Sequence, residues 1–244
     1  MTDRVPLIEI RGLVTGPVGV PAVHGLDLVV GSGEVVALLG PNGAGKSVTL
    51  AAIAGHLPVM DGVVEVLGRS IKGESVHAIA RRGLALLPSD RGLFFQLTVA
   101  ENLRLYRNKQ STIERDAVLE LFSSLRPILS RKVGLLSGGE QQMLALACSL
   151  IAGSRVVLID ELSRGLAPVV VQQLLPTLRH AADEIGLGVL LVEQHVAGAL
   201  SVADRAYVLS QGRVMMSGTA SELRAKGNLI EASYLGNSDA GETG

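Results

Sequence analysis

The chain has 244 residues, of which 48% are hydrophobic and 18% charged, and this composition excludes a disordered polypeptide. Its formal net charge of −1 lacks the basic excess of a general nucleic-acid-binding protein, so we expect no nucleic-acid partner. No segment approaches the roughly 20 consecutive apolar residues of a membrane-spanning helix, so we expect any membrane association to come through another chain.

Short β-rich segments alternate with helical patterns, which is typical of an α/β fold with a buried, largely parallel sheet. The first ten residues include Asp3, Arg4 and Glu9, a composition that does not predict a signal peptide. Glycine and proline residues between positions 12 and 21 predict a loop between the first two strands. The first part of the chain is predicted to hold a helix at Val48–Ala54 and strands at Val5–Ile10, Leu26–Val30, Val35–Leu39, Val63–Val66 and Leu84–Leu87.

The middle of the chain, residues 89–152, is predicted to contain helices and loops but no strand. Thr98–Glu101 and Ser111–Glu114 both fit the capping box that begins a helix, and Met143–Leu150 predicts an apolar helix. We interpret this stretch as a helical insertion into the α/β fold.

Strands resume in the last third of the chain, and Thr219–Glu222 is a further capping box. The polar, glycine-rich residues 237–244 predict a flexible tail. The single cysteine, Cys148, cannot form an internal disulfide, which fits a reducing compartment. The strands of this part are predicted at Val156–Ile159, Gly188–Val192, Ala206–Leu209 and, after a turn, Val214–Met216.

Residues 40–47 read Gly-Pro-Asn-Gly-Ala-Gly-Lys-Ser and match the phosphate-binding loop pattern in full. Glycines let backbone N–H groups approach phosphate oxygens, and the helix that follows points its positive dipole end at the same anion. Lys46 is expected to reach the β- and γ-phosphates of ATP, and the Ser47 hydroxyl to ligate Mg²⁺. A glycine-rich turn without a ligand is the alternative, and the apolar strand before the loop argues against it. The predicted nucleotide-binding residues here are Gly40, Pro41, Asn42, Gly43, Ala44, Gly45, Lys46, Ser47 and Val48.

A second apolar strand ends at two acidic residues, Asp160 and Glu161. Ligands lie at the carboxyl ends of parallel strands, so we expect Asp160 to hold Mg²⁺ through water. Glu161 would accept the proton of the attacking water as the general base. Two exposed acids without a function are the alternative, which the phosphate-binding loop upstream makes the weaker interpretation.

Residues 136–142 read Leu-Ser-Gly-Gly-Glu-Gln-Gln and precede the predicted apolar helix. With this segment the sequence resembles the ATP-binding subunits of the ABC transporter family. The resemblance implies that Ser137, Gly138, Gly139 and Glu140 bind the nucleotide held by the opposite subunit of a dimer. A helix N-terminus with a hydroxyl and two glycines is suited to an anion.

Other segments carry the same resemblance over nearly the whole chain. Val192–His195 is similar to the switch-histidine segment of the family, which implies that His195 lies near the γ-phosphate as a second catalytic residue. Ser163–Pro168 resembles the loop that contacts the second subunit of the dimer. Pro88–Phe94 and Leu97–Leu103 resemble the segments that meet the membrane subunit.

These segments, with Tyr234–Gly236, are most similar to the ATPases of branched-chain amino-acid importers and their amide and urea relatives. The resemblance implies a P-loop NTPase (RecA-like) core sheet with an N-terminal antiparallel β subdomain and an inserted helical subdomain. It also implies membrane permease subunits, a periplasmic or extracellular solute-binding protein and a second ATPase subunit as partners, at the cytoplasmic face of the membrane. The implied domain is 1–236, with its core in 1–88 and 153–236 and a helical signature subdomain in 89–152.

Some positions depart from the family pattern. Ser89 stands where the family has glutamine or glutamate that helps to ligate Mg²⁺, and the neighbouring Asp90 is the alternative ligand. An aromatic residue that stacks on adenine is expected near Thr15, yet none occurs in the N-terminal third of the chain. An aliphatic side chain, such as that of Val14 or Val23, would have to contact the base instead.

Three functions follow from these observations. The first is a dimeric transport ATPase. The second is a nucleotide-dependent regulator acting on ribosomes or DNA, although such chains generally carry a second cassette or basic extensions that are absent here. The third is an ATP-binding, weakly hydrolysing partner in a heterodimeric complex, which the departures from the family pattern keep open.

Overall fold

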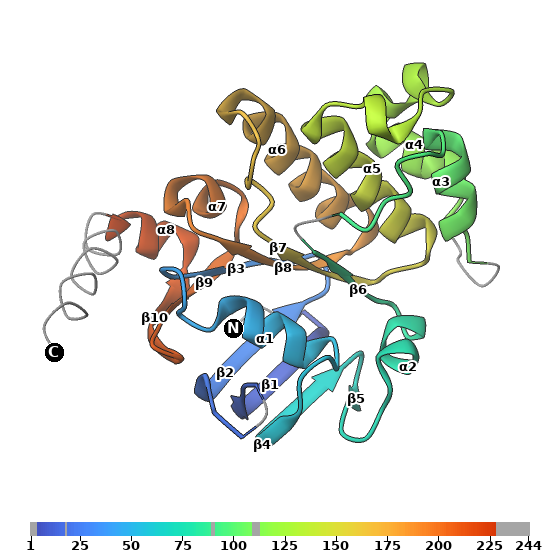
Figure 1. Ribbon diagram of the computed structural model, residues 1–244. Helices are drawn as coiled ribbons and strands as arrows, with labels where there is room; N and C mark the ends of the chain where they lie inside the picture. The colour runs from blue at the N-terminus through green and yellow to red at the C-terminus, as the bar shows by residue number, and fades with distance from the viewer. Residues whose placement is uncertain (1–3, 18, 89–90, 109–112, 228–244) are drawn as a thin grey trace, which may run out of the picture.

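The computed structural model describes residues 4–17, 19–88, 91–108 and 113–227. These residues form two β-sheets, with a helix between them and a layer of helices on the far side of the larger sheet (Figure 1). This arrangement confirms the predicted α/β fold class with its antiparallel β subdomain. Within the described residues, no helix combines the length and the apolar character needed to cross a membrane.

The smaller sheet is antiparallel and has four strands in the order β2-β1-β4-β5. The prediction of a loop at Gly12 is wrong, because Gly12 lies inside β1 at a φ of 62°. The register with β2 shifts between Ile10 and Leu13, and this bulge lets the strand continue beyond Ile10. The strands of this sheet span Pro6–Thr15 (β1), Val23–Gly31 (β2), Val59–Val66 (β4) and Arg69–Ser70 (β5).

The larger sheet has six strands in the order β10-β9-β3-β8-β7-β6, and all neighbours pair in parallel except β10 with β9. Leu39 of β3 pairs with Glu193 of β8, and Asp160 of β7 pairs with Val192 of β8. The carboxyl ends of three central strands therefore lie at one edge, where ligands bind in parallel sheets. The strands span Val35–Leu39 (β3), Leu84–Leu87 (β6), Val156–Asp160 (β7), Gly188–Glu193 (β8), Arg205–Ser210 (β9) and Arg213–Thr219 (β10).

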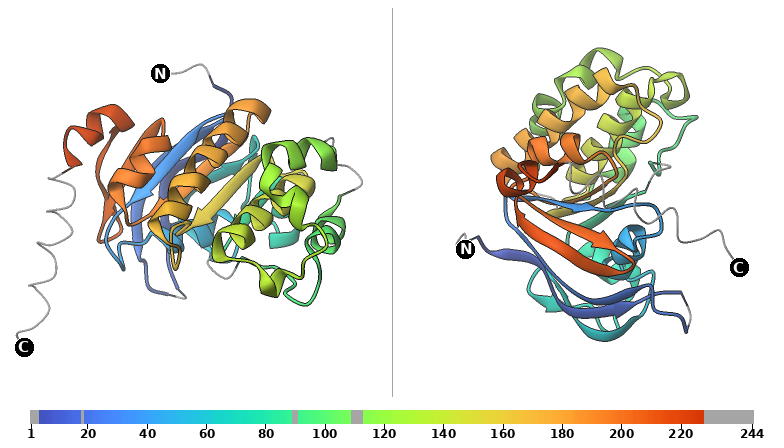
Figure 2. Two further views of the ribbon diagram at one scale, coloured as in Figure 1. Left: turned by 90° about the horizontal axis from the view of Figure 1, so that it is seen from above. Right: turned by 90° about the vertical axis from the view of Figure 1, so that its left-hand side faces the viewer.

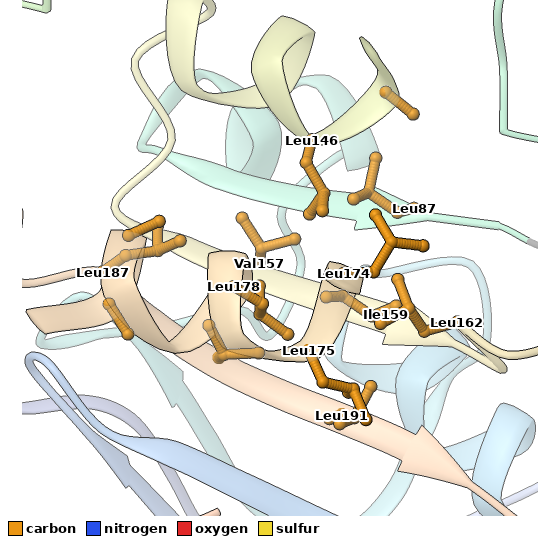
Figure 3. Close-up of a cluster of buried hydrophobic side chains, with 14 of the residues drawn as sticks. Leu87, Leu146, Val157, Ile159, Leu162, Leu174, Leu175, Leu178, Leu187 and Leu191 are labelled. Atoms are coloured by element: carbon orange, nitrogen blue, oxygen red, sulfur yellow. The ribbon is translucent and has the colours of Figure 1, made fainter. Parts of the chain in front are cut away.

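Alternate residues of the central strands face two separate cores. Val157 faces the core that contains α5, α6 and α7, whereas Leu158 faces the core formed with α1 and the antiparallel sheet. Figure 3 shows Leu174, Leu175 and Leu178 of α6 lying against the strands of the first core. Strands buried on both faces explain the continuous apolar runs in the sequence. The four helices span Lys46–Ile53 (α1), Gly138–Ile151 (α5), Pro168–Ile185 (α6) and Val196–Val202 (α7).

Between β6 and β7 the described residues form helices and loops without a strand, and this group lies to one side of the sheet (Figure 2, left). The capping box at Thr98–Glu101 is confirmed, because each residue's side chain accepts a hydrogen bond from the other's backbone N–H. The capping box at Ser111–Glu114 is wrong: Glu114 is the N-cap of α4 rather than its third residue, and Ser111 lies outside the described residues. This part holds Val99–Tyr106 (α3), Arg115–Leu121 (α4), Ser123–Ile128 (η1) and Val133–Leu135 (η2).

Several helix boundaries differ from the sequence prediction. Helix α1 begins at Lys46 rather than Val48, after Gly45 in the left-handed conformation, so the phosphate-binding loop runs directly into it. Helix α5 begins at Gly138 rather than Met143, because Ser137 and Glu140 form a capping box. Helix α6 was not predicted, although proline at its first position is a helix-start signal. Two short helices complete the fold, at Val76–Arg81 (α2) and Ala220–Arg224 (α8), the latter begun by the predicted capping box at Thr219.

Candidate functional site

The phosphate-binding loop connects β3 to α1 and surrounds the side chain of Lys46. Lys46 is 5% exposed, and its Nζ donates hydrogen bonds to the carbonyl oxygens of Gly40 at 2.7 Å and Pro41 at 2.9 Å. Gly43 has a φ of 78°, and a Cβ atom there would point into open space. The loop is therefore folded around a cation and keeps one open face, an arrangement suited to an anion.

The other predicted loop residues differ in exposure. Asn42 is exposed, whereas Ala44 and Gly45 are buried, and Val48 packs against the core beneath α1. A Cβ atom at Gly45 would lie 3.0 Å from the side chain of Val23. Val23 itself is fully buried, so it offers no surface to an adenine base. This burial rules out one of the two aliphatic contacts that the sequence suggested.

Burial lowers the pKa of Lys46, and the negative charges of Glu161, Asp160 and Glu193 act against this effect. All three carboxylates come from the ends of β7 and β8. The parallel register of β3, β8 and β7 brings these groups to the phosphate-binding loop, although they are far apart in the sequence. The site thus combines a buried cation with nearby acidic groups, as phosphate chemistry with a divalent metal requires.

Ser47 and Asp160 lie next to each other at the mouth of this site. The Ser47 hydroxyl donates to Oδ1 of Asp160 at 3.0 Å. Burial raises the pKa of Asp160, and the hydrogen bond from Ser47 partly opposes that shift. A hydroxyl and a carboxylate are oxygen ligands of the kind Mg²⁺ prefers, and Mg²⁺ usually takes its remaining ligands from substrate phosphates and water. The two residues therefore fit a Mg²⁺ ion bound together with a nucleotide.

Glu161 follows β7 in the left-handed conformation, with a φ of 54°. Its backbone N–H donates to the carbonyl oxygen of Val192 at 3.0 Å. Its Oε1 atom accepts a hydrogen bond from Nε2 of Gln194 at 2.6 Å, and its Oε2 atom lies 3.4 Å from Nη1 of Arg164. These contacts hold a partly buried carboxylate beside the phosphate-binding loop, where a general base would be needed.

His195 is the N-cap residue of α7 and is exposed. It lines a hollow of about 590 Å³ together with Asn42, Glu161 and Ser163. The structure therefore brings His195 and Glu161 to one cavity beside the phosphate-binding loop, and the contact of His195 with a γ-phosphate stays a prediction.

Ser137 and Glu140 form the capping box at the N-terminus of α5. Several strands and helices separate α5 from the phosphate-binding loop along the chain. Glu140 also pairs with Arg131 at 3.3 Å. A Cβ atom at Gly139 would lie 2.2 Å from Val170 of α6, and one at Gly138 would lie 2.7 Å from the side chain of Leu166. Among the described contacts, none joins these four predicted residues to Lys46 or Ser47. Their nucleotide-binding role within a dimer stays a prediction.

Two site residues were missed by the sequence analysis, Glu193 and Gln194. Glu193 is 3% exposed, and its carboxylate accepts hydrogen bonds from the backbone N–H and the hydroxyl of Ser163. Gln194 joins Glu161 to Asn42 through Nε2. The sequence did contain a signal for them, because two polar residues follow the apolar run of β8. Since β8 pairs in parallel with β7, its end lies beside Asp160.

Ser89 and Asp90, the two candidates for the metal-sensing position, lie outside the described residues. The neighbouring Arg91 is described, and it has a φ of 67°. Its guanidinium donates to Oε1 of Gln141 at 2.8 Å and to Oε1 of Gln142 at 3.1 Å. This segment is therefore attached to the first turns of α5.

Comparison with known families gives one match over more than half of the chain. The model of the ABC transporter family matches residues 23–164. The matched segment includes the phosphate-binding loop, the Ser137–Glu140 helix start, and Asp160 and Glu161 at the end of β7.

Individual relatives extend this match. The high-affinity branched-chain amino acid transport ATP-binding protein BraG of Pseudomonas aeruginosa is 38% identical over 221 residues, covering 89% of this chain and 94% of the relative. The probable branched-chain amino acid transport ATP-binding protein LivF of Archaeoglobus fulgidus is 39% identical over 202 residues, covering 81% and 86%. The lipopolysaccharide export system ATP-binding protein LptB of Escherichia coli is 35% identical over 223 residues, covering 88% and 90%.

A solved structure described as the ATP-binding subunit of an ABC transporter superposes with a TM-score of 0.78 and 28% identity, covering 94% of this chain and 99% of that one. A second, the ADP conformation of the ATP-binding cassette MJ1267, superposes with a TM-score of 0.79 at 21% identity, covering 94% and 98%. The second likeness concerns the fold alone.

Proposed function

The chain belongs to the ABC transporter family as an ATPase subunit, and we propose that it powers an importer of branched-chain or other hydrophobic amino acids. The observation that carries this proposal is the similarity over nearly the whole chain to BraG and LivF, whose names describe branched-chain amino-acid transport. The sequence segments around Leu97–Leu103 and Val192–His195 point to the same branch.

In the proposed reaction, Lys46 and the loop N–H groups bind the β- and γ-phosphates of ATP. Ser47 and Asp160 hold Mg²⁺, which neutralises charge on the phosphate oxygens when bound. Glu161 would accept the proton of the water that attacks the γ-phosphate, and His195, which lines the same hollow, would contact that phosphate. The hydrogen bonds of Glu161 support this assignment because they fix its carboxylate beside the loop.

The proposed active unit is a dimer in which the start of α5 completes the site of the second subunit. The first N–H groups of a helix have no acceptor within the helix, so those of Gly138 and Gly139 suit the γ-phosphate of an opposing nucleotide. The exposed Ser137 at the N-cap supports this role. We propose a homodimer or a heterodimer with a related ATPase.

A permease subunit is proposed to dock beside the segment of residues 88–103. This segment exposes Phe94 by 53% and Phe95 by 45%, which is unusual for phenylalanine in a chain with only three. An adjoining cavity of about 340 Å³ is lined mainly by apolar side chains of α2, β6, α3 and α5. The chain would act as a peripheral subunit at the cytoplasmic face, with a solute-binding protein on the opposite side of the membrane.

Reconstitution tests this proposal. The chain is purified with the membrane and solute-binding proteins that accompany it, placed in proteoliposomes, and assayed for uptake of radiolabelled leucine, isoleucine and valine. Uptake that requires Mg-ATP and is lost with Glu161→Gln is the expected result. ATP hydrolysis that no amino acid stimulates, with no uptake, would contradict the importer assignment.

Export is the second candidate, and the similarity to LptB is the observation that favours it. The same preparation distinguishes the two, because an export system contains no solute-binding protein and moves its substrate away from the ATPase. A third candidate is a weakly hydrolysing subunit of an asymmetric pair, which Ser89 favours because it lacks a glutamine's reach. Ordinary turnover by the isolated chain would exclude it.

A further inference from the structure

A buried carboxylate joins the ends of β7 and β8. Glu193, the last residue of β8, accepts the backbone N–H of Ser163 at 2.8 Å through Oε1 and the Ser163 hydroxyl at 2.7 Å through Oε2. Burial raises the pKa of this carboxylate, and the hydrogen bonds from Ser163 and from the backbone N–H of Gln194 partly oppose that shift. A carboxylate that is 3% exposed would be costly without such donors, so these contacts are integral to the site.

The Glu193–Ser163 contact is not an ion pair. No salt bridge to Glu193 occurs among the described residues, and its bonded partners are neutral donors from two neighbouring loops. An apolar residue at the end of β8 would avoid the burial of a charge, and the rest of the strand is apolar. The charge of this carboxylate also acts on Lys46, but its hydrogen bonds go to the turn after Glu161.

That turn contains a strained residue at its start. Glu161 has a φ of 54°, a conformation that costs free energy for a residue with a side chain and persists only where neighbouring contacts impose it. The N–H of Glu161 donates a hydrogen bond to the carbonyl oxygen of Val192, the residue before Glu193. The N–H of Ser163, two residues further along the turn, donates to the carboxylate of Glu193. Two consecutive residues of β8 thus fix the turn on either side of Leu162.

The same turn reaches the start of α5. Within it, the N–H of Leu166 donates to the carbonyl oxygen of Ser163 at 3.1 Å. The side chain of Leu166 lies where a Cβ atom on Gly138 would approach it to 2.7 Å. Fixing Ser163 therefore also fixes the residue that packs against Gly138.

We propose that Glu193 is a positioning residue for ATP hydrolysis, which holds the turn through Ser163 and so sets the direction of the Glu161 carboxylate. This inference rests on the proposed role of Glu161 as the general base. Among the described residues the side-chain hydrogen bonds of Glu193 go to the turn and none goes to the phosphate-binding loop, so its loss should lower turnover and leave nucleotide binding intact. A misplacement of a catalytic group by about 1 Å lowers turnover by about 100-fold.

The test compares Glu193→Met, which keeps the chain length without hydrogen bonding, with Glu193→Gln. Glutamine keeps an oxygen for the Ser163 N–H, and its NH₂ group donates to the Ser163 oxygen once the hydroxyl rotates. We expect Glu193→Met to lower kcat by about 100-fold with an unchanged Kd for Mg-ATP, and Glu193→Gln to retain most of the activity. Glu184→Met, at an exposed position of α6, is the matched control for loss of a glutamate and should keep the wild-type kcat.

A double-mutant cycle adds a second readout. Ser163→Ala removes one of the two hydrogen bonds and should lower kcat by about 10-fold. Because the two residues act through one contact, Ser163→Ala should cause no further loss in the Glu193→Met background. Additive losses, an equal fall in Mg-ATP affinity, or wild-type kcat in Glu193→Met would each overturn the proposal. If Glu193→Met does not fold, Ser163→Ala and Glu193→Gln decide: wild-type kcat in Ser163→Ala, or an inactive but nucleotide-binding Glu193→Gln, overturns it.

Amide hydrogen exchange separates this proposal from the proposed function. The Ser163 N–H should exchange faster in Glu193→Met and at the wild-type rate in Glu184→Met. If wild-type protein hydrolyses no ATP, or if Glu161→Gln turns over at the wild-type rate, the proposed role of Glu161 fails. In that case unchanged exchange at Ser163 overturns the Glu193 inference as well, whereas faster exchange supports the positioning contact by itself.

Discussion

Gln194 donates a hydrogen bond of 2.6 Å from Nε2 to Oε1 of Glu161. The same nitrogen donates to Oδ1 of Asn42 in the phosphate-binding loop at 2.7 Å. One amide therefore connects the proposed general base to the loop that would hold the nucleotide. It leaves Oε2 of Glu161 as the oxygen available to water, since the hydrogen-bond partner of this atom in the described part of the chain is Arg164, at 3.4 Å.

Replacing Gln194 with leucine keeps the size of the side chain and removes both hydrogen bonds. Hydrogen bonds to a charged group contribute about 1.5–3 kcal/mol, so we expect kcat for ATP hydrolysis to fall by at least about 10-fold. The KM for ATP should change little, because the Lys46 contacts are untouched. Phosphate-release kinetics measure both values.

Gln172→Leu, at an exposed position of α6, is the control for this substitution and should behave as wild type. A Gln194→Leu variant with unchanged kcat would mean that Glu161 is oriented by the turn alone. A variant with raised kcat would mean that the amide restrains the base in a resting position.

Much of this site was predictable from short segments of sequence. The phosphate-binding loop, Asp160 and Glu161 were identified because each lies in a local pattern whose chemistry depends on adjacent residues. The fold class followed from the alternation of strands and helices and from the family resemblance. The antiparallel subdomain is present as the resemblance implied.

The remaining features depend on contacts between distant segments. Gln194 contacts Glu161 because Asp160 of β7 pairs with Val192 of β8. The sequence of either strand alone does not predict this register. Val23 is buried because it faces the core that β2 shares with α1, and the sequence around it does not show which face of the strand it takes. Tertiary packing therefore determines both the Gln194–Glu161 contact and the burial of Val23.

Arg91 should stabilise the contact between its loop and α5. Its guanidinium is bonded to the amide oxygens of Gln141 and Gln142, which are 8% and 6% exposed. Arg91→Ala leaves two buried acceptors without these donors, so we expect the free energy of unfolding to fall by about 2 kcal/mol. Arg91→Lys should recover less than half of the loss, because lysine lacks the planar fork that reaches both oxygens.

Urea denaturation of the three proteins measures these differences. Arg104→Ala, at an exposed position of α3, is the control for loss of an arginine. Equal stability of wild type and Arg91→Ala would show that water replaces the guanidinium at both amides.

Asp204 should make stability depend on pH in the acidic range. Burial acts to raise its pKa, but the Val35 N–H together with Arg179 and Arg4 holds the pKa below the ordinary value of 3.8. The folded state therefore binds the proton less readily than the unfolded state. The stabilisation is present above the unfolded pKa and is lost as pH falls through the lower folded value.

Asp204→Asn removes this charge and should lower the free energy of unfolding by about 2 kcal/mol at pH 7. The difference from wild type should begin to shrink below about pH 4, where the unfolded wild-type chain starts to bind a proton at Asp204, and should vanish once the folded protein binds it at a lower pH. Urea denaturation at a series of pH values gives the comparison. A difference that stays constant down to the acid limit of folding would contradict the assigned direction.

The start of α5 should act on the phosphate-binding loop of a second subunit. Ser137 is both the N-cap of α5 and the proposed nucleotide contact, so alanine there would weaken the helix and the site together. Aspartate caps a helix as well as serine does, but it puts a carboxylate where a γ-phosphate is expected. Ser137→Asp should therefore fold normally, bind ATP as a monomer and lose hydrolysis. Thr219→Asp changes the equivalent capping box of α8 and should keep wild-type turnover.

Mixing the Ser137→Asp protein with a Lys46→Ala protein tests whether the two residues belong to different subunits. If the site is shared, a mixed dimer pairs the intact loop of one subunit with the intact Ser137 of the other and has one complete site. Equal mixing makes about half of the dimers mixed, so turnover should recover to roughly a quarter of the wild-type rate. If both residues served the same subunit, each would carry one defect and no complete site would form. Recovery above either variant alone is therefore the expected result, and its absence at concentrations where the mixed dimer is present would contradict the shared site.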